Sequence, residues 1–185
     1  MKIDKKKLSE RDICSKYITP AIVSAGWDLH TQIREEVSFT KGRVLVRGKL
    51  HTRGEQKRAD YVLYFKPNIA LAVIEAKENN LSVSAGMQQA LNYAETLEVP
   101  FVFSSNGDGF IFHDRTGLAD KTEQEISLQE FPTPAELWQR YCKWKGIESS
   151  DARHTVEMPY YDDGTGRAPR YYQSSAVNNT IEAVA

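Results

Sequence analysis

The sequence predicts an α/β fold, in which helices flank a mixed β-sheet. Short apolar runs bounded by turn residues alternate along the chain with longer segments whose apolar residues recur at helical spacing. The chain has 185 residues, of which 41% are hydrophobic and 26% are charged. This length and composition predict an ordinary globular protein with one well-buried domain and some sequence to spare.

A cytoplasmic location is expected. No apolar run approaches the roughly 20 residues that span a bilayer. The charged start of the chain is not followed by the apolar core of a signal peptide. Cys14 and Cys142 form no CxxC pattern, which favours two free thiols in a reducing compartment over a disulfide.

The first predicted element is a helix over residues 8–25. Ser9 and Asp12 have the spacing of a capping box. Apolar residues lie near one face of this helix: Ile13, Tyr17, Ile18, Ala21 and Ile22. We expect Pro20 to kink or split the helix and Gly26 to end it.

Strands and a second helix are predicted in the middle of the chain. The helix covers 83–97, and its apolar stripe consists of Met87, Ala90, Leu91, Ala94 and Leu97. Residues 59–65 and 69–75 form a hairpin around Pro67-Asn68. The other segments with strand character are 32–39, 43–51, 99–107 and 109–115.

The composition changes after about residue 130. A short helix rich in aromatic residues is predicted over 131–146, and a polar, turn-rich stretch follows it. We therefore divide the chain into a domain at 1–150, a linker at 151–168 and the start of a further domain at 169–185.

The hairpin is expected to bring charged groups together. If Pro67 and Asn68 are the central residues of a tight turn, Asp60 lies opposite Glu75. Pro-Asn is not a favoured hairpin pair, so a longer loop or a bulge would shift this register by one residue. Glu75 and Lys77 share one face of their strand, because side chains alternate.

Two carboxylates and an ammonium group in one place fit a metal-dependent hydrolase. Neighbouring carboxylates repel each other, and a divalent cation removes the conflict. Mg²⁺ prefers a few carboxylates, waters and substrate phosphate oxygens. A lysine beside the ion can orient or deprotonate a water and neutralise an oxyanion, as phosphodiester hydrolysis requires. The alternative is an Asp–Lys–Glu salt-bridge cluster that caps the strand ends.

Basic residues are concentrated just before Asp60, although the net charge of the chain is −1. Residues 41–58 contain seven basic residues, among them Arg53, Lys57 and Arg58, against one acidic residue. This cluster fits a phosphate-binding face, and it equally fits a solvated edge strand whose long basic side chains prevent aggregation.

Asp60 followed by Glu75-Ala76-Lys77 resembles the PD-(D/E)xK nuclease motif, with Ala59 at the position of the proline. The ordered segments LSERDI, RADYVLYF, AVIEAK and GMQQALNYAETLEVPFVFSSNG resemble the N-terminal nuclease domain of type I restriction enzyme R subunits over about residues 8–115. This resemblance implies a restriction-endonuclease-like mixed β-sheet flanked by helices.

The resemblance also implies roles for single residues. Asp60 and Glu75 would be Mg²⁺ ligands and Lys77 the catalytic lysine. Glu10 matches an acid that faces the metal site, although an acid in a first helical turn is also favoured by the helix dipole.

Gln89 and Tyr93 match a QxxxY element that would complete the catalytic site and contact DNA together with Arg53, Lys57 and Arg58. At i and i+4 the two side chains share a helix face, which lies opposite the stripe of Met87, Leu91 and Ala94. Solvated residues are the other explanation for such a face.

The segment RAPRYYQ at 167–173 resembles the start of a superfamily 2 helicase motor, in which Gln173 would contact adenine. A polar residue near a helix start is the simpler explanation of Gln173. The chain has no GxxxxGK[ST] loop, so ATP would be bound only by the full-length subunit.

The function implied by the resemblance is that of a Mg²⁺-dependent endonuclease domain of a type I restriction-modification enzyme. It would cut double-stranded DNA without sequence preference after ATP-driven translocation, in a complex with specificity and methylation subunits, and would be weak or inactive alone. Two alternatives are a stand-alone repair-type nuclease of the same superfamily and a non-catalytic assembly module of the same fold.

Overall fold

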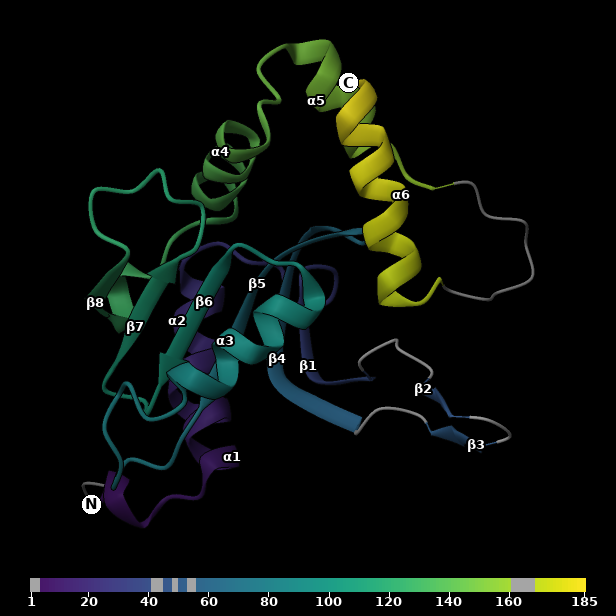
Figure 1. The fold of residues 1–185 in the computed structure, drawn as a ribbon. Coiled ribbons are helices and arrows are strands. Elements are labelled where there is room, and N and C mark those ends of the chain that lie inside the picture. The colour runs from purple at the N-terminus through teal and green to yellow at the C-terminus, as the bar shows by residue number, and fades with distance from the viewer. Residues whose placement is uncertain (1–3, 41–44, 48–49, 53–55, 161–168) are drawn as a thin grey trace.

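A computed structural model describes residues 4–40, 45–47, 50–52, 56–160 and 169–185 of the chain. Its main sheet has six strands in the order β1-β4-β5-β6-β7-β8 (Figure 1). The pair β5–β6 is parallel and the other neighbours are antiparallel. The six strands are β1 (Ile33–Thr40), β4 (Gln56–Lys66), β5 (Ile69–Ala76), β6 (Phe101–Ser105), β7 (Gly109–Asp114) and β8 (Glu123–Ser127). The mixed sheet flanked by helices confirms the predicted fold class.

A small second sheet is formed by β2 (Leu45–Arg47) and β3 (Leu50–Thr52), which pair antiparallel. The single strand predicted at 43–51 is therefore two short strands in the part of this segment that the structure describes. Arg53 lies outside the described residues.

The N-terminal helical segment follows a short 3₁₀ turn, η1 (Lys5–Lys7), and changes its hydrogen bonding before Pro20. It consists of α1 (Glu10–Ile13), the π-helical segment η2 (Cys14–Ile18) and α2 (Thr19–Ser24). Proline has no N–H, and a wider helical turn before it accommodates the missing donor. The predicted capping box of Ser9 and Asp12 is present, and Gly26 has the left-handed φ of +96° expected after a helix end.

The helix α3 (Met87–Leu97) connects the parallel strands β5 and β6 and covers one face of the sheet. Figure 1 shows α3 in front of the sheet and α2 behind it. A parallel pair requires such a crossover. The core on the α3 side contains Phe39, Val62, Val73, Ala90, Ala94, Leu97 and Val102.

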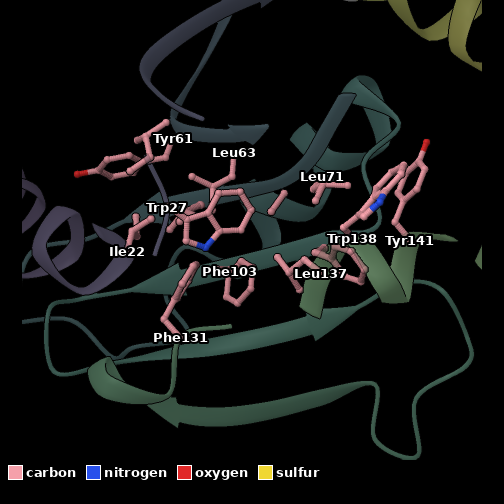
Figure 2. Packing of buried hydrophobic residues seen from close by; sticks show 14 of the residues in the cluster. Ile22, Trp27, Tyr61, Leu63, Leu71, Phe103, Phe131, Leu137, Trp138 and Tyr141 are labelled. Carbon is pink, nitrogen blue, oxygen red and sulfur yellow. The ribbon is translucent and has the colours of Figure 1, made fainter. Parts of the chain in front are cut away.

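The opposite face of the sheet carries the larger core, which is rich in aromatic residues. Figure 2 shows these side chains gathered together, with Trp138 and Tyr141 of α4 (Pro134–Lys145) at one end of the cluster. Its largest fully buried side chains are Trp27, Tyr61, Phe101, Phe103 and Phe110. Because β5 is buried at every residue except the half-buried Ala70, the strand that carries Glu75 is held between two cores.

The C-terminal part adds a 3₁₀ turn, η3 (Leu128–Glu130), and three helices. The helix α4 matches the predicted helix at 131–146. The first part of the predicted linker instead forms α5 (Ser150–Glu157), and α6 (Tyr171–Val184) forms the last helix. Cys14 and Cys142 are free thiols, as predicted. Among the described residues, none of the helices combines the length and the apolar character needed to cross a membrane.

Candidate active site and adjoining groove

The predicted register of the β4–β5 hairpin is confirmed. Tyr61 pairs with Ile74 and Val62 with Val73, as a turn at Pro67-Asn68 requires. Two register shifts lie nearer the turn, between Leu63 and Tyr64 and between Tyr64 and Lys66, and they cancel each other. The hairpin therefore contains the irregularity that Pro-Asn suggested, without displacing its far end.

β5 separates from β4 just after these pairs. Glu75 and Ala76 pair with Ser104 and Ser105 of β6, and the Ala76 N–H, which no longer has a backbone partner on β4, donates to Asp60 Oδ2 over 2.7 Å. An aspartate side chain thus takes the place of a strand carbonyl. This contact fixes the Asp60 carboxylate beside Glu75.

The ammonium group of Lys77 joins the two strands to the first helix. Its Nζ lies 2.8 Å from Glu75 Oε1 and 3.8 Å from Glu10 Oε2 at the start of α1. The Glu75 side chain is 3% exposed, whereas that of Glu10 is 42% exposed. The structure therefore brings Glu10, Asp60, Glu75 and Lys77 together, although they come from three different elements.

The carboxylates of this cluster are hard to ionise together. Burial, followed by the charge of Asp60, raises the pKa of Glu75 to about 7. Burial also raises the pKa of Asp60 and that of Glu10. Desolvation lowers the pKa of Lys77, but the hydrogen bond and charge of Glu75 and the charges of Glu10 and Asp60 outweigh it, so the pKa lies above its usual value. Lys77 is thus an ammonium group beside these carboxylates.

One carboxylate oxygen of this site is left without a partner. Glu75 Oε2 is buried and accepts no hydrogen bond. Asp60 and Glu75 offer the hard oxygen donors that Mg²⁺ prefers, and Mg²⁺ commonly takes one or two carboxylates together with waters and substrate phosphates. Within the described ranges, no larger cluster of three His, Cys, Asp or Glu residues is arranged to hold a metal. The residues present fit an ion that the substrate helps to coordinate.

Two positions that support Glu75 were missed by the sequence analysis. A Cβ atom on Gly86 would lie 2.9 Å from Glu75 Cγ and 3.0 Å from Ser104 Oγ. Ser104 Oγ donates to Val83 O and accepts from Gly86 N. The loop before α3 is thereby fastened over Glu75. A glycine just before a helix was the available signal.

Gln89 and Tyr93 form a bonded pair, and Gln89 Nε2 donates to the Tyr93 hydroxyl over 2.8 Å. The expectation that both side chains lie away from the core is wrong for Tyr93, which is buried and packs edge-on against Phe39. The buried face of α3 includes Ala90 and Leu97, and Tyr93 lies next to both. Gln89 remains exposed, as expected.

An open groove of about 630 Å³ lies between β4 and α3. The side chains that line it are polar or basic except for Ala85: Gln56, Lys57, Arg58, Gln88, Gln89, Asn92 and Tyr93. The ammonium of Lys57 lies 5.6 Å from the centre of the Tyr93 ring, and Arg58 is two residues before Asp60. Four of the residues predicted to contact DNA thus share one groove, and the fifth, Arg53, is among the residues that the structure does not describe.

Gln173 lies on α6, where its Oε1 accepts a hydrogen bond from Arg170 N over 2.9 Å. The exposed side chain therefore caps the start of its own helix. Its contact with adenine remains a prediction.

Comparisons with known proteins agree with these observations. Residues 29–132 match the family described as the type I restriction enzyme R protein N terminus. The chain is 54% identical over 178 residues to the type I restriction enzyme EcoAI endonuclease subunit of Escherichia coli. The matched region covers 96% of this chain but only 22% of the length of that protein. A solved fragment from Vibrio vulnificus YJ016, assigned as an HsdR subunit of a type I restriction enzyme, has a TM-score of 0.79 and 40% identity over 96% of this chain and 32% of that one. The chain therefore belongs to the family of type I restriction enzyme R protein N termini.

Proposed function

We propose that this chain is the endonuclease domain of a type I restriction-modification enzyme, of the PD-(D/E)xK type, and that it hydrolyses DNA phosphodiester bonds with Mg²⁺. The observation that carries the proposal is Glu75, whose buried Oε2 has no hydrogen-bond partner beside a second carboxylate. A buried carboxylate with an unpartnered oxygen is costly unless a cation binds to that oxygen. The family and the name of the Escherichia coli relative support the same function.

Asp60 and Glu75 would hold the ion, which stabilises charge on the phosphate and lowers the pKa of a bound water when present. Lys77 carries a proton and stands beside Glu75, so it can neutralise charge that develops on a phosphate oxygen or orient the attacking water. Glu10 remains a charge partner for Lys77 when Glu75 faces the ion.

The groove supports double-stranded DNA as the substrate. Lys57 and Arg58 supply positive charge, and the amides of Gln88, Gln89 and Asn92 can donate to phosphate oxygens. Contacts of this kind carry no base information, so cleavage is expected to be independent of sequence. Target choice, translocation and ATP use would belong to the specificity and methylation subunits and to the remaining length of the R subunit.

The test uses the full-length subunit in its complete complex, with Asp60→Ala and Lys77→Ala. Each substitution should reduce DNA cleavage by a factor on the order of 10²–10⁴ and leave ATP hydrolysis unchanged. Glu125→Gln on β8, an exposed acid on the last strand of the sheet, is the control and should cut normally. Undiminished cutting by both site variants would reject the proposal, and efficient cutting by the isolated chain without ATP would favour a stand-alone nuclease.

A further inference from the structure

We propose that Phe39 and Tyr171 are positioning residues for the Gln89–Tyr93 pair. Through these two residues, the docking of α6 sets the shape of the groove between β4 and α3. Three aromatic rings connect α6 to this groove. The Tyr171 ring lies 6.2 Å from that of Phe39 at an angle of 73°, and the Phe39 ring lies 5.3 Å from that of Tyr93 at 88°. The consequence for DNA rests on the function proposed above, but the positioning itself does not.

The first link is the attachment of α6 to the end of β1. The Tyr171 hydroxyl donates to the carbonyl of Thr40 over 2.7 Å, and its ring meets the neighbouring Phe39. Phe39 is 5% exposed and belongs to the core between the sheet and α3. A helix at the C-terminal end of the described chain is thus fixed to a buried ring on an edge strand.

The second link joins the end of β1 to the β4 residues that line the groove. Phe39 pairs with Lys57 and Thr40 pairs with Gln56, and both partners line the groove. Phe39 and Thr40, which contact Tyr171, are therefore the strand partners of two groove residues.

The third link is the orientation of Tyr93. One edge contact with Phe39 and the ammonium of Lys57 restrict the Tyr93 ring, while its hydroxyl holds Gln89. If the Phe39 ring shifts, the Tyr93 ring can rotate, and Gln89 loses the partner that keeps its amide at the groove. Edge-to-face contacts of this kind are specific in geometry, which an aliphatic side chain does not reproduce.

The test compares four variants of the 185-residue chain: Tyr171→Leu, Phe39→Leu, Tyr171→Phe and Asn179→Ala. Asn179 is the control, because its Nδ2 donates to Glu98 and so contributes to α6 docking away from the aromatic rings. Two readouts are used: the NMR resonances of the Gln89 side-chain amide, and the affinity for a short duplex at low salt with Ca²⁺ in place of Mg²⁺.

Tyr171→Leu and Phe39→Leu should each shift the Gln89 amide resonances and weaken DNA binding about fivefold, the size of one such aromatic contact. Tyr171→Phe keeps the ring contact with Phe39 but loses the hydrogen bond to Thr40, so it should fall between the wild type and Tyr171→Leu in both readouts, and Asn179→Ala should match the wild type. Unshifted Gln89 resonances in both leucine variants would overturn the proposal, as would equal shifts in Asn179→Ala. The resonances report the positioning even if the chain does not bind DNA, so a failure of the proposed function is recognised separately.

Discussion

Glu75 is held in a state that is costly for a buried carboxylate. It is 2% exposed, one of its oxygens has no hydrogen-bond partner, and its pKa is raised to about 7. A second carboxylate, Asp60, is fixed beside it by the backbone of Ala76. Strongly shifted pKa values of this kind concentrate at functional sites, because burial and like charges that harm stability also prepare a group for chemistry.

This strain predicts how stability depends on pH without metal. The pKa of Glu75 is about 7 in the folded protein and near 4.5 in the unfolded chain, so the folded protein holds this proton more tightly. The folded state therefore binds more protons than the unfolded state between about pH 4.5 and 7. The stability that this proton contributes is fully present below about pH 4.5 and is lost as the pH rises through about 7.

Glu75→Gln should remove that loss. We expect the free energy of unfolding in EDTA at pH 8 to rise by about 1–3 kcal/mol relative to the wild type, with a smaller difference at pH 5. Urea denaturation at both pH values measures it. A wild-type protein that gains stability relative to Glu75→Gln as the pH rises would contradict the assigned shift.

At the scale of elements, β5 explains why the site forms where it does. The strand pairs with β4 alone near the hairpin turn, with both β4 and β6 from Ala72 to Ile74, and with β6 alone at Glu75 and Ala76. The loop before α3 packs over the point where β5 leaves β4, because Gly86 lies against Glu75 and its N–H donates to Ser104 Oγ. Glu75 is therefore buried where the two strands separate, whereas Asp60 is half-buried and the Glu10 side chain is 42% exposed.

Gly86→Ala tests the loop's role. Gly86 has φ −87° and ψ −9°, which alanine adopts easily, so the added methyl acts only through its contacts with Glu75 and Ser104. We expect a loss of about 1–3 kcal/mol in the free energy of unfolding and weaker Mg²⁺ binding by calorimetry, because Glu75 is displaced. Ser84→Ala, at an exposed position in the same loop, is the control, and equal effects in the two variants would contradict this account.

At the scale of the whole molecule, the features that could be predicted are those that depend on residues close together in the sequence. Most strand and helix types, the capping box and the hairpin register follow from local patterns, although the strand β8 and the helix α5 were not predicted. The hairpin alone brings Asp60, Glu75 and Lys77 together. The burial of Tyr93 and the contact between Tyr171 and Phe39 depend on how distant segments pack. The apolar stripe of α3 predicted most of its buried face, but it did not show that the buried face also includes Tyr93, so these contacts were beyond sequence patterns.

The same limit applies to α6, which sequence reasoning assigned to the start of a further domain. In the structure α6 contacts four separate parts of the preceding α/β fold. Tyr171 reaches Thr40, Asn178 donates to the hairpin turn at Asn68, and Asn179 reaches Glu98. Glu182 is buried, lies 2.8 Å from Lys145 and accepts a hydrogen bond from Tyr141, both on α4. These contacts are typical of a helix that is part of the domain it covers.

A chain that ends after Met158 tests whether α6 belongs to this domain in energetic terms. If it does, the truncated chain should lose about 2–4 kcal/mol of unfolding free energy, the sum expected for a few hydrogen bonds and a buried ion pair at roughly 1 kcal/mol each. Glu182→Ala in the 185-residue chain should produce part of this loss, since it removes the carboxylate that contacts both Lys145 and Tyr141. Thermal and urea unfolding of the three chains provide the comparison. If truncation left the midpoint and the slope of unfolding unchanged, α6 would be only an attached segment, and the boundary near residue 169 would mark the start of the next domain.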